Sequence, residues 1–372
     1  MNKKNQLKRA GEPLVRIVKR EGVPLWRAWG VRIAAVILAL LVCALFIYFI
    51  TGLNPIQVYS VMFQGSFKSK YKVLCTLRDT ALLLGIGIAL APAFKMRFWN
   101  IGAEGQVLMG GLATAVVMIY CNSLPTWLLF ILMIVASIAA GALWGLIPAI
   151  FKAKWNTNET LFTLMMNYVA INIVLCVTNI WRGEKSAMGM INMHTKAGWF
   201  PEIFGYRFSL NIILIFALMI AMFVYLKYSK QGYEIAVVGE SENTARYAGI
   251  NVKKVIIRTM IISGAICGIC GFITVAGKDQ TISTSTSGGY GFTAIIVTWM
   301  AKFNTFYMAI MSFLLIFLNN GAAQIASAYT SLNDYAASII TGIILFFILG
   351  SEFFINYRLV FRGKAAKEAR SK

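Results

Sequence analysis

Residues 98–111 read FWNIGAEGQVLMGG and continue as LATAVVMIY at 112–120, so a glutamate, a glutamine and an asparagine stand in what should be a membrane-spanning segment. A helix needs about 20 mostly apolar residues to cross the ~30 Å hydrocarbon layer of a bilayer. Residues 101–120 meet that requirement, although Glu104 and Gln106 are polar. An acidic side chain in a membrane helix costs about 2.5–3.5 kcal/mol, so Glu104 must have a functional or a structural reason.

The rest of the chain is also apolar. Of its 372 residues, 59% are hydrophobic and 13% are charged, and the mean hydropathy is +0.70. Ordinary soluble domains have about 25% charged residues, so the composition predicts an all-α integral membrane protein embedded in lipid. The net charge of +21 does not indicate nucleic-acid binding, because the basic residues lie in tails and loops instead of on one soluble face.

Apolar runs between turn and charge signals predict ten transmembrane spans. These are residues 33–51, 74–95, 101–120, 126–151, 160–181, 209–226, 258–276, 291–302, 304–323 and 335–355. Cytoplasmic loops are enriched in Lys and Arg, which tests the number of spans. With the N-terminus inside, most of the 35 basic residues fall in the tails and inner loops, so both termini are expected to be cytoplasmic.

This topology predicts three regions in a protein of the cell membrane. A basic cytoplasmic tail covers residues 1–32, the transmembrane domain covers 33–355, and a second basic cytoplasmic tail covers 356–372. The first apolar run, VRIAAVILALLVCALFIYFI, lacks a small-residue cleavage site, so we expect it to be retained as a helix.

Two of the ten spans differ from the others. The third opens with NIGAEGQ at 100–106, and the eighth, 291–302, is short and follows SGGYG. Each is the third span in a set of five, and the two run in opposite directions. Short or glycine-interrupted segments at corresponding positions of two halves indicate a transport pathway at an inverted-repeat axis. The sequence therefore predicts a five-plus-five inverted repeat in which these two segments meet.

Polar residues in or beside the spans, together with two aromatic residues at the start of the eighth, are the candidates for the pathway. Glu104 either lines the pathway or forms a turn at the cytoplasmic edge, paired to Lys95 or Arg97. Thr157 or Asn158 fits the N-cap of the fifth span. Asn167, about two turns further on, cannot be a cap and needs an interhelical partner or a polar cavity. The complete set of candidates is Asn100, Glu104, Gln106, Asn158, Glu159, Asn167, Tyr290 and Phe292.

The polar inner loop at 227–258 contains the signals of a short helix. Ser241 or Asn243 can cap its start, and Ala248 and Gly249 can end it. A helix that projects from the membrane face would suit a permease that receives force from a cytoplasmic motor. The alternative is a solvated basic loop.

Motifs for catalysis and for metal binding are missing. The sequence has no phosphate-binding loop, no H-E-x-x-H and no G-x-S-x-G, so we do not expect an enzyme. Cys267 and Cys270 form a CGIC motif, but the chain has only one histidine, which favours packing over a metal site. The six cysteines lie in or beside apolar runs, and we expect no disulfide. Two small-xxx-small patterns, Gly141 with Gly145 and Gly264 with Gly268, predict close helix packing.

Four stretches together resemble the permease subunits of ATP-binding-cassette importers of the branched-chain amino acid, ribose and nucleoside group. They are FWNIGAEGQ (98–106), NETLFTLMMNY (158–168), GYEIAVVGESENTARYAGI (232–250) and GGYGFTAIIV (288–297). The resemblance covers nearly the whole chain and is strongest to the nucleoside or simple-sugar branch. It implies the ten-helix permease fold of the second structural type of importer.

The resemblance also implies partners and a coupling helix. The partners are a second, shorter permease, a cytoplasmic ATP-binding-cassette ATPase and an external substrate-binding lipoprotein, and no cofactor is implied. The residues that match the coupling helix of the family are Gly239, Glu240, Asn243, Ala245, Arg246, Ala248 and Gly249. Ser241 and Tyr247 depart from the common form of that helix.

The sequence is therefore compatible with three functions. The first is a permease half whose third, fifth and eighth spans line a path for a nucleoside or simple sugar. The second is a proton-coupled secondary transporter in which Glu104 carries the proton. The third is a structural membrane subunit without a pathway of its own.

Overall fold

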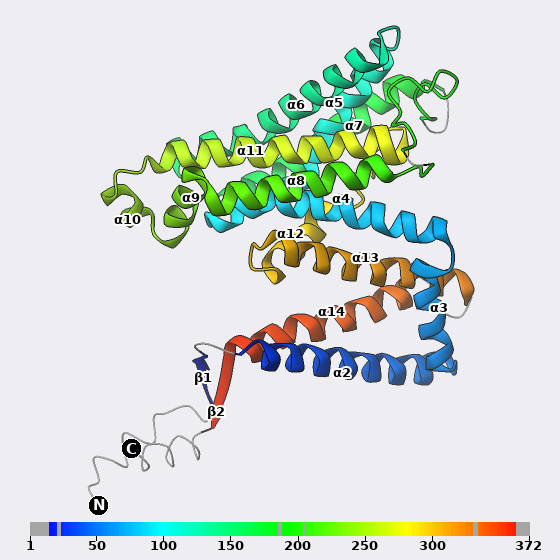
Figure 1. Cartoon of the computed structure of the whole chain (residues 1–372), viewed down its shortest axis with the longest axis vertical. Coiled ribbons are helices and arrows are strands. Elements are labelled where there is room, and N and C mark those ends of the chain that lie inside the picture. Colours follow the sequence, from blue (N-terminus) through cyan, green and yellow to red (C-terminus); the bar gives the residue numbers. More distant parts are fainter. Residues whose placement is uncertain (1–14, 21–23, 185–187, 204, 330–333, 362–372) are drawn as a thin grey trace, which may run out of the picture. The chain divides into compact units, whose positions relative to one another are not determined.

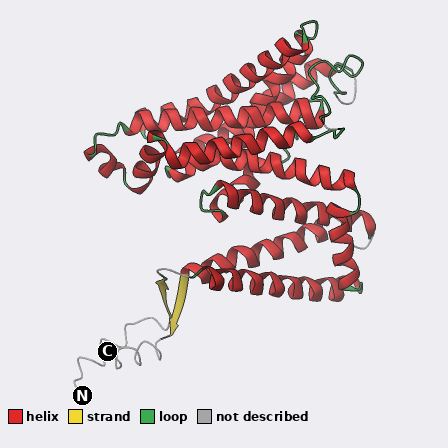
Figure 2. Ribbon diagram, in the orientation of Figure 1, coloured by secondary structure: helices red, strands yellow, loops and turns green. Residues whose placement is uncertain are grey.

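The computed structural model describes residues 15–20, 24–184, 188–203, 205–329 and 334–361, and nearly all of its elements are helices (Figures 1 and 2). The first part of the chain forms β1 (Val15–Lys19), α2 (Leu25–Thr51), α3 (Pro55–Phe67), α4 (Lys70–Lys95), α5 (Ala103–Tyr120), α6 (Thr126–Trp155) and α7 (Glu159–Arg182). The remainder forms α8 (Ser209–Tyr228), α9 (Lys230–Glu240), α10 (Glu242–Tyr247), α11 (Val252–Ile273), the π-helix η1 (Thr274–Asp279), α12 (Tyr290–Met300), α13 (Thr305–Ala328), α14 (Asp334–Asn356) and β2 (Tyr357–Phe361).

Among the described residues, eight helices are long and apolar enough to span a membrane. They are α2, α4, α5, α6, α7, α8, the continuous α11 and η1, and α13. Two shorter apolar helices, α12 and residues 339–355 of α14, correspond to the eighth and tenth predicted segments. The 11 residues of α12 rise only about 16 Å, roughly half of the hydrocarbon thickness. This helix therefore does not cross the membrane alone.

The chain divides into two compact units, and the first contains residues 1–65 and 318–372. In this unit α2 packs against α14, and the Cys43 thiol donates a hydrogen bond to the Ile340 carbonyl at 3.7 Å. β1 and β2 form an antiparallel ribbon in which Val15 pairs with Phe361 and Lys19 with Tyr357. The regions predicted as tails thus include both strands and the start of α2, while residues 1–14, 21–23 and 362–372 lie outside the described residues.

The second unit, residues 66–317, has a core of three helices. In the most apolar stretches of α4, α5 and α11, 72%, 67% and 72% of the residues are buried. The corresponding share is 22% in α6, 22% in α7 and 28% in α8. The glutamate-containing helix α5 is therefore a central element, and α6, α7 and α8 leave most of their surface open to lipid or to a partner chain.

Glycines bring α6 and α11 into close contact, as the small-xxx-small patterns predicted. A methyl group added to Gly145 would lie 2.8 Å from the Met260 carbonyl oxygen, and one added to Gly264 would lie 3.0 Å from the Gly141 carbonyl carbon. Contact at this distance leaves no room for any side chain. Gly268 also lies against α5, because a methyl group added to Gly110 would lie 2.9 Å from the Gly268 carbonyl carbon. The close packing of α5, α6 and α11 fixes the position of the start of α5.

Candidate functional site

The polypeptide is irregular between the end of α4 and the start of α5. Arg97 has a positive φ of 61°, and helix geometry resumes only at Ala103. Residues such as Asn100 are nevertheless completely buried. Backbone N–H and C=O groups in such a buried break need partners, because neither helix geometry nor water satisfies them.

α7 supplies partners for this break. The Asn167 amide oxygen accepts a hydrogen bond from the Gly105 N–H at 2.8 Å, and its amide nitrogen donates to the Ile101 carbonyl at 2.8 Å. The Thr163 hydroxyl oxygen, one turn earlier, accepts from the Ile101 N–H at 3.1 Å. Asn167 therefore has an interhelical partner, one of the two roles that its position in the fifth span predicted.

Glu104 joins the start of α5 to the start of α12. Its side chain is buried, and its carboxylate accepts hydrogen bonds from the Gly289 N–H at 3.0 Å, the Gly291 N–H at 2.8 Å and the Ser287 hydroxyl. Its partners are thus the turn before α12 and not Lys95 or Arg97. An ionised carboxylate is an acceptor only, so it suits three converging donors.

The two broken segments therefore meet, as the sequence predicted. The approach is close because Gly291 has no side chain: a methyl group there would lie 2.6 Å from the Glu104 backbone nitrogen. Gly289, at φ 71°, adopts the left-handed conformation that lets the chain turn into α12. Glu104 also lies at the positive end of α5, where the helix dipole favours an anion.

A pair of buried amides completes the polar network. Asn100 and Gln106 exchange two hydrogen bonds of 3.3 Å, and the Asn100 amide nitrogen also donates to the Ser263 hydroxyl of α11 at 3.2 Å. The Asn100 oxygen further accepts from the Gly102 N–H at 3.0 Å. The break is thereby bonded to α7, α11 and α12.

Three aromatic rings lie beside the same break. Trp99 stacks on Trp299 of α12 with ring centroids 5.2 Å apart, and Phe94 of α4 contacts both rings at 5.9 and 6.0 Å. Both tryptophans remain partly exposed. These contacts join the end of α4 to the end of α12, so α12 is held at both of its ends.

The other four pathway candidates lie outside the network around Glu104. Asn158 is the N-cap of α7 and accepts from the Leu161 N–H at 3.2 Å, while Glu159 pairs with Lys152 at 3.0 Å. The ring of Tyr290 lies under the Lys278 ammonium at 5.4 Å, and Phe292 is exposed. The structure thus brings together Asn100, Glu104, Gln106 and Asn167. Tyr290 stands in the chain between Gly289 and Gly291, but its side chain, like those of the other three, forms no bond with this network.

The inner loop folds into α9 and α10. Ser241 caps α10, because its hydroxyl oxygen accepts a hydrogen bond from the Thr244 N–H at 3.3 Å. Gly249 follows the helix with φ 77°. Ala245 and Gly239 are buried, and a methyl group on Gly239 would collide with the Lys95 backbone. The side chains of Glu240, Asn243, Arg246 and Ala248 are exposed.

A partly buried ion-pair cluster was missed by the sequence analysis. Arg78 and Asp79, adjacent in α4, are 2.9 Å apart, and Lys278 of η1 lies 3.6 Å from the same carboxylate. The Arg78 guanidinium also lies over the Phe208 ring at 4.5 Å. Two adjacent ionisable residues in the otherwise apolar run LRDTALLL are a signal that would have found it, because membrane helices rarely hold unpaired charges.

No group of three or more metal-ligating side chains occurs among the described residues. The six cysteines, all of them described, are free thiols. Cys267 and Cys270 are buried within the packed face of α11.

Replacing Asn167 by alanine is expected to reduce transport by roughly tenfold and to lower the melting temperature of the purified protein. The change leaves the Gly105 N–H and the Ile101 carbonyl buried without partners, and each unsatisfied group costs about 1–3 kcal/mol. The matched control is Asn172→Ala, since Asn172 is exposed and bonds only to the Tyr168 carbonyl of its own helix. Equal behaviour of the two variants in uptake and thermal denaturation would contradict the role given to Asn167.

Comparisons with known proteins identify the family. Residues 73–349 match the family described as branched-chain amino acid transport system / permease component. The chain is 27% identical over 354 residues to the glucose ABC transporter permease protein TsgB13 of Haloferax volcanii, covering 91% of this chain and 92% of that protein. It is 29% identical to the guanosine ABC transporter permease protein NupP of Bacillus subtilis, covering 86% and 93%. No solved structure matches the chain.

A further relative is the nucleoside ABC transporter permease protein NupB of Lactococcus lactis, 26% identical over 80% of this chain and 84% of that protein. The family match confirms the resemblance seen in the four sequence stretches. It also makes the chain a transport component instead of an enzyme, working with an ATPase partner. The chain, with its apolar helices and its two broken segments joined at Glu104, thus belongs to the branched-chain amino acid transport system permease family. It is a multi-pass membrane permease of an ATP-binding-cassette transporter.

Proposed function

We propose that the chain forms half of the translocation path of an ATP-driven importer for nucleosides or simple sugars. The relatives named for guanosine, nucleosides and glucose support this substrate class. These solutes are neutral and rich in hydroxyl groups. A path for them needs polar groups and aromatic faces, but no compensating charge.

The observation that carries the proposal is the bond between Glu104 and the start of α12. It joins two interrupted segments deep in the unit, and interrupted segments of this kind surround transport pathways. In this proposal Glu104 and Asn167 hold the segments together. The path itself runs along the outer surfaces of α5, α7 and α12, where Phe292 is exposed.

A second permease subunit completes the path in this proposal. α7 supports it, because its outer surface has a groove of about 420 Å³. The groove is lined by Asn158, Leu161, Phe162, Met165, Met166 and Val169. Met165 is 55% exposed, so a large part of this apolar surface is open to a partner.

An external binding lipoprotein delivers the substrate to the opposite end of the unit from α10. A pocket of about 450 Å³ at the end of η1 supports such an entry. Its lining includes Trp199, Arg207 and Gln280, and Arg207 donates a hydrogen bond to Gln280 at 3.0 Å. The protein resides in the cytoplasmic membrane with both termini cytoplasmic, so α10 faces the ATPase.

α10 is the proposed contact with the ATPase. Its side chains are mostly polar and exposed, while Ala245 is buried against the body of the unit. Tyr247 is 93% exposed. A large aromatic side chain that projects this far is a typical anchor of a protein interface. Gly239 and Ala245 support the shape of the loop instead, because both are packed against the body of the unit.

Replacing Tyr247 by alanine is expected to reduce co-purification of the ATPase at least tenfold without lowering the yield of the permease. Loss of a central aromatic anchor costs about 2 kcal/mol or more of binding free energy. Tyr228→Ala is the control, because Tyr228 is also exposed but lies at the end of α8. Retention of the ATPase by the Tyr247 variant, measured by affinity pull-down of the tagged permease, would place the contact elsewhere.

The proposed substrate class is tested by uptake. Cells that express the complete transporter should accumulate radiolabelled guanosine or glucose, and depletion of ATP should abolish the uptake. Competition among unlabelled nucleosides and sugars then ranks the substrates. Uptake by vesicles that contain this chain alone, driven by a proton gradient, would overturn the proposal.

A further inference from the structure

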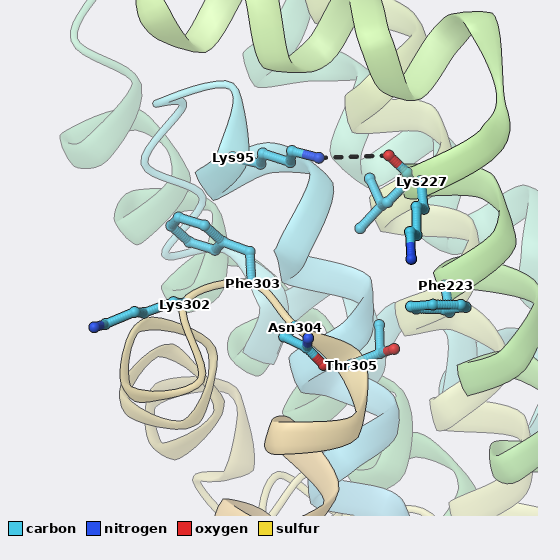
Figure 3. A pocket seen from close by; sticks show the side chains of 8 residues that line it. Lys95, Phe223, Lys227, Lys302, Phe303, Asn304 and Thr305 are labelled. Carbon is cyan, nitrogen blue, oxygen red and sulfur yellow. Dashed lines mark hydrogen bonds between the residues drawn. The ribbon is translucent and has the colours of Figure 1, made fainter. Parts of the chain in front are cut away.

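A basic pocket of about 250 Å³ lies where α4 and α8 end and α13 begins (Figure 3). It is lined by Lys95, Phe223, Leu226, Lys227, Lys302, Phe303, Asn304 and Thr305. All of these residues belong to the second unit. The pocket is separate from the network around Glu104, and neither the pathway nor the coupling helix uses its side chains.

Positive charge dominates this pocket. Three lysines line it, and no carboxylate does. Among the described residues, neither Lys95 nor Lys227 forms an ion pair. Lys95 donates to the Leu226 carbonyl at 3.4 Å, and the Lys227 ammonium lies 5.3 Å from the centre of the Phe223 ring. Figure 3 shows the ammonium group of Lys302 pointing away from the other two, so Lys95 and Lys227 are the cations available to a ligand.

A buried hydroxyl without a partner indicates that the pocket holds a ligand. Thr305 is 2% exposed, and its hydroxyl oxygen forms no hydrogen bond in the described structure. Buried polar groups are nearly always bonded, so an orphan that lines a pocket suggests a missing partner. Thr305 is also the first residue of α13, whose dipole favours an anion. The Asn304 side chain already accepts hydrogen bonds from the Phe306 and Tyr307 N–H groups, so the Thr305 hydroxyl is the group left for a ligand.

Apolar surface adjoins the basic pocket. Phe223 of α8 and Phe306 of α13 pack edge to face with centroids 5.0 Å apart. Val224 and Ile310 extend this exposed apolar surface along the same two helices. Cations beside exposed apolar side chains suit an anionic group presented at the boundary between lipid and water.

We propose that this pocket binds a phosphate group through Lys95, Lys227 and the Thr305 hydroxyl. Lysine ammonium groups and a helix N-terminus are common ligands of phosphate. Either an anionic phospholipid or free phosphate presents this group, and the two sources are distinguished by experiment. Gly239, at the end of α9, packs on the Lys95 backbone, so occupancy also stabilises the base of the inner loop.

The test uses the full-length chain purified in detergent, with phosphatidylglycerol, phosphatidylcholine and inorganic phosphate as separate probes. Retained lipid is counted by native mass spectrometry, and the melting temperature is followed for each probe. The wild type is expected to retain phosphatidylglycerol over phosphatidylcholine, and the double variant Lys95→Gln/Lys227→Gln to lose roughly tenfold or more in affinity. If the pocket takes its phosphate group from a lipid, only phosphatidylglycerol should raise the melting temperature. If it binds free phosphate, inorganic phosphate should raise the melting temperature without added lipid.

Three further variants keep the test interpretable. Lys230→Gln removes one positive charge from the exposed start of α9, outside the pocket, and should behave like the wild type. Lys95→Arg/Lys227→Arg retains both charges and should retain binding. This variant therefore still tests the pocket if the glutamine variant fails to fold. Thr305→Val keeps both lysines and should weaken binding about threefold, within the range for one hydrogen bond. Failure of phosphatidylglycerol and of phosphate to stabilise the wild type, or equal binding by the Lys230 and Lys95/Lys227 glutamine variants, would overturn the proposal.

Discussion

Replacing Glu104 by glutamine is expected to lower substrate uptake at least tenfold. The carboxylate accepts from the Gly289 and Gly291 N–H groups and from the Ser287 hydroxyl. Glutamine has one acceptor oxygen, and its amide N–H₂ would face a donor. Each lost hydrogen bond to a charged group is worth about 1.5–3 kcal/mol, so the start of α12 should detach from α5. Initial rates of uptake by the complete transporter measure the effect.

Glu184→Gln provides the matched control. This substitution makes the same change in charge and in shape, but Glu184 lies exposed in the segment after α7. It should transport normally. Glu104→Asp should also fail, because a shorter side chain cannot reach both glycine N–H groups. Normal uptake by Glu104→Gln in a protein of normal yield would show that this carboxylate is not needed to hold α12.

Replacing Gly264 by leucine is expected to abolish accumulation of folded protein. A methyl group at Gly264 would already lie 3.0 Å from the Gly141 carbonyl carbon and 3.2 Å from the Ala142 Cα. These neighbours are backbone atoms, so they cannot rotate away. The two helices would have to separate, which removes contacts along the most extensive helix pair of the unit and costs about 3 kcal/mol or more. Membrane yield and size-exclusion profiles measure this effect.

The same substitution at Gly342 separates the effect of packing from that of helix propensity. Gly342 lies in α14, and a methyl group added there would meet no atom within 4 Å. Gly342→Leu should therefore accumulate as well as the wild type, since leucine favours a helix more than glycine does. Normal yield of the Gly264 variant would contradict the close contact between α6 and α11.

The sequence predicted the helical spans and the meeting of the two broken segments because both depend on local pattern. The length of the apolar runs predicted the helices. Polar or glycine-rich interruptions of those runs identified residues 100–106 and 288–291 as the broken segments. Asn167 could be recognised as needing a partner because an amide in mid-helix has no local one. Its partners, the Gly105 N–H and the Ile101 carbonyl, could not be predicted, because they depend on how α7 crosses the break.

Other features depend on contacts between distant residues. The ribbon of β1 and β2 pairs segments about 340 residues apart, and five residues carry too little pattern to predict such pairing. The orphan hydroxyl of Thr305 is visible only once α13 and α8 are placed together. The pair Arg78 and Asp79 is different, because its signal was present in the sequence and only the partner Lys278 was hidden.

A double-mutant cycle on Glu104 and Ser287 tests the joining of the broken segments most directly. Glu104→Gln, Ser287→Ala and the double variant are compared with the wild type by thermal denaturation of the purified transporter and by uptake. If the carboxylate holds the turn before α12, the two changes should be coupled by about 1 kcal/mol or more, and the double variant should transport little worse than Glu104→Gln alone. Additive effects, within about 0.3 kcal/mol, would mean that the two side chains act independently and would contradict the bond by which Glu104 holds the turn before α12.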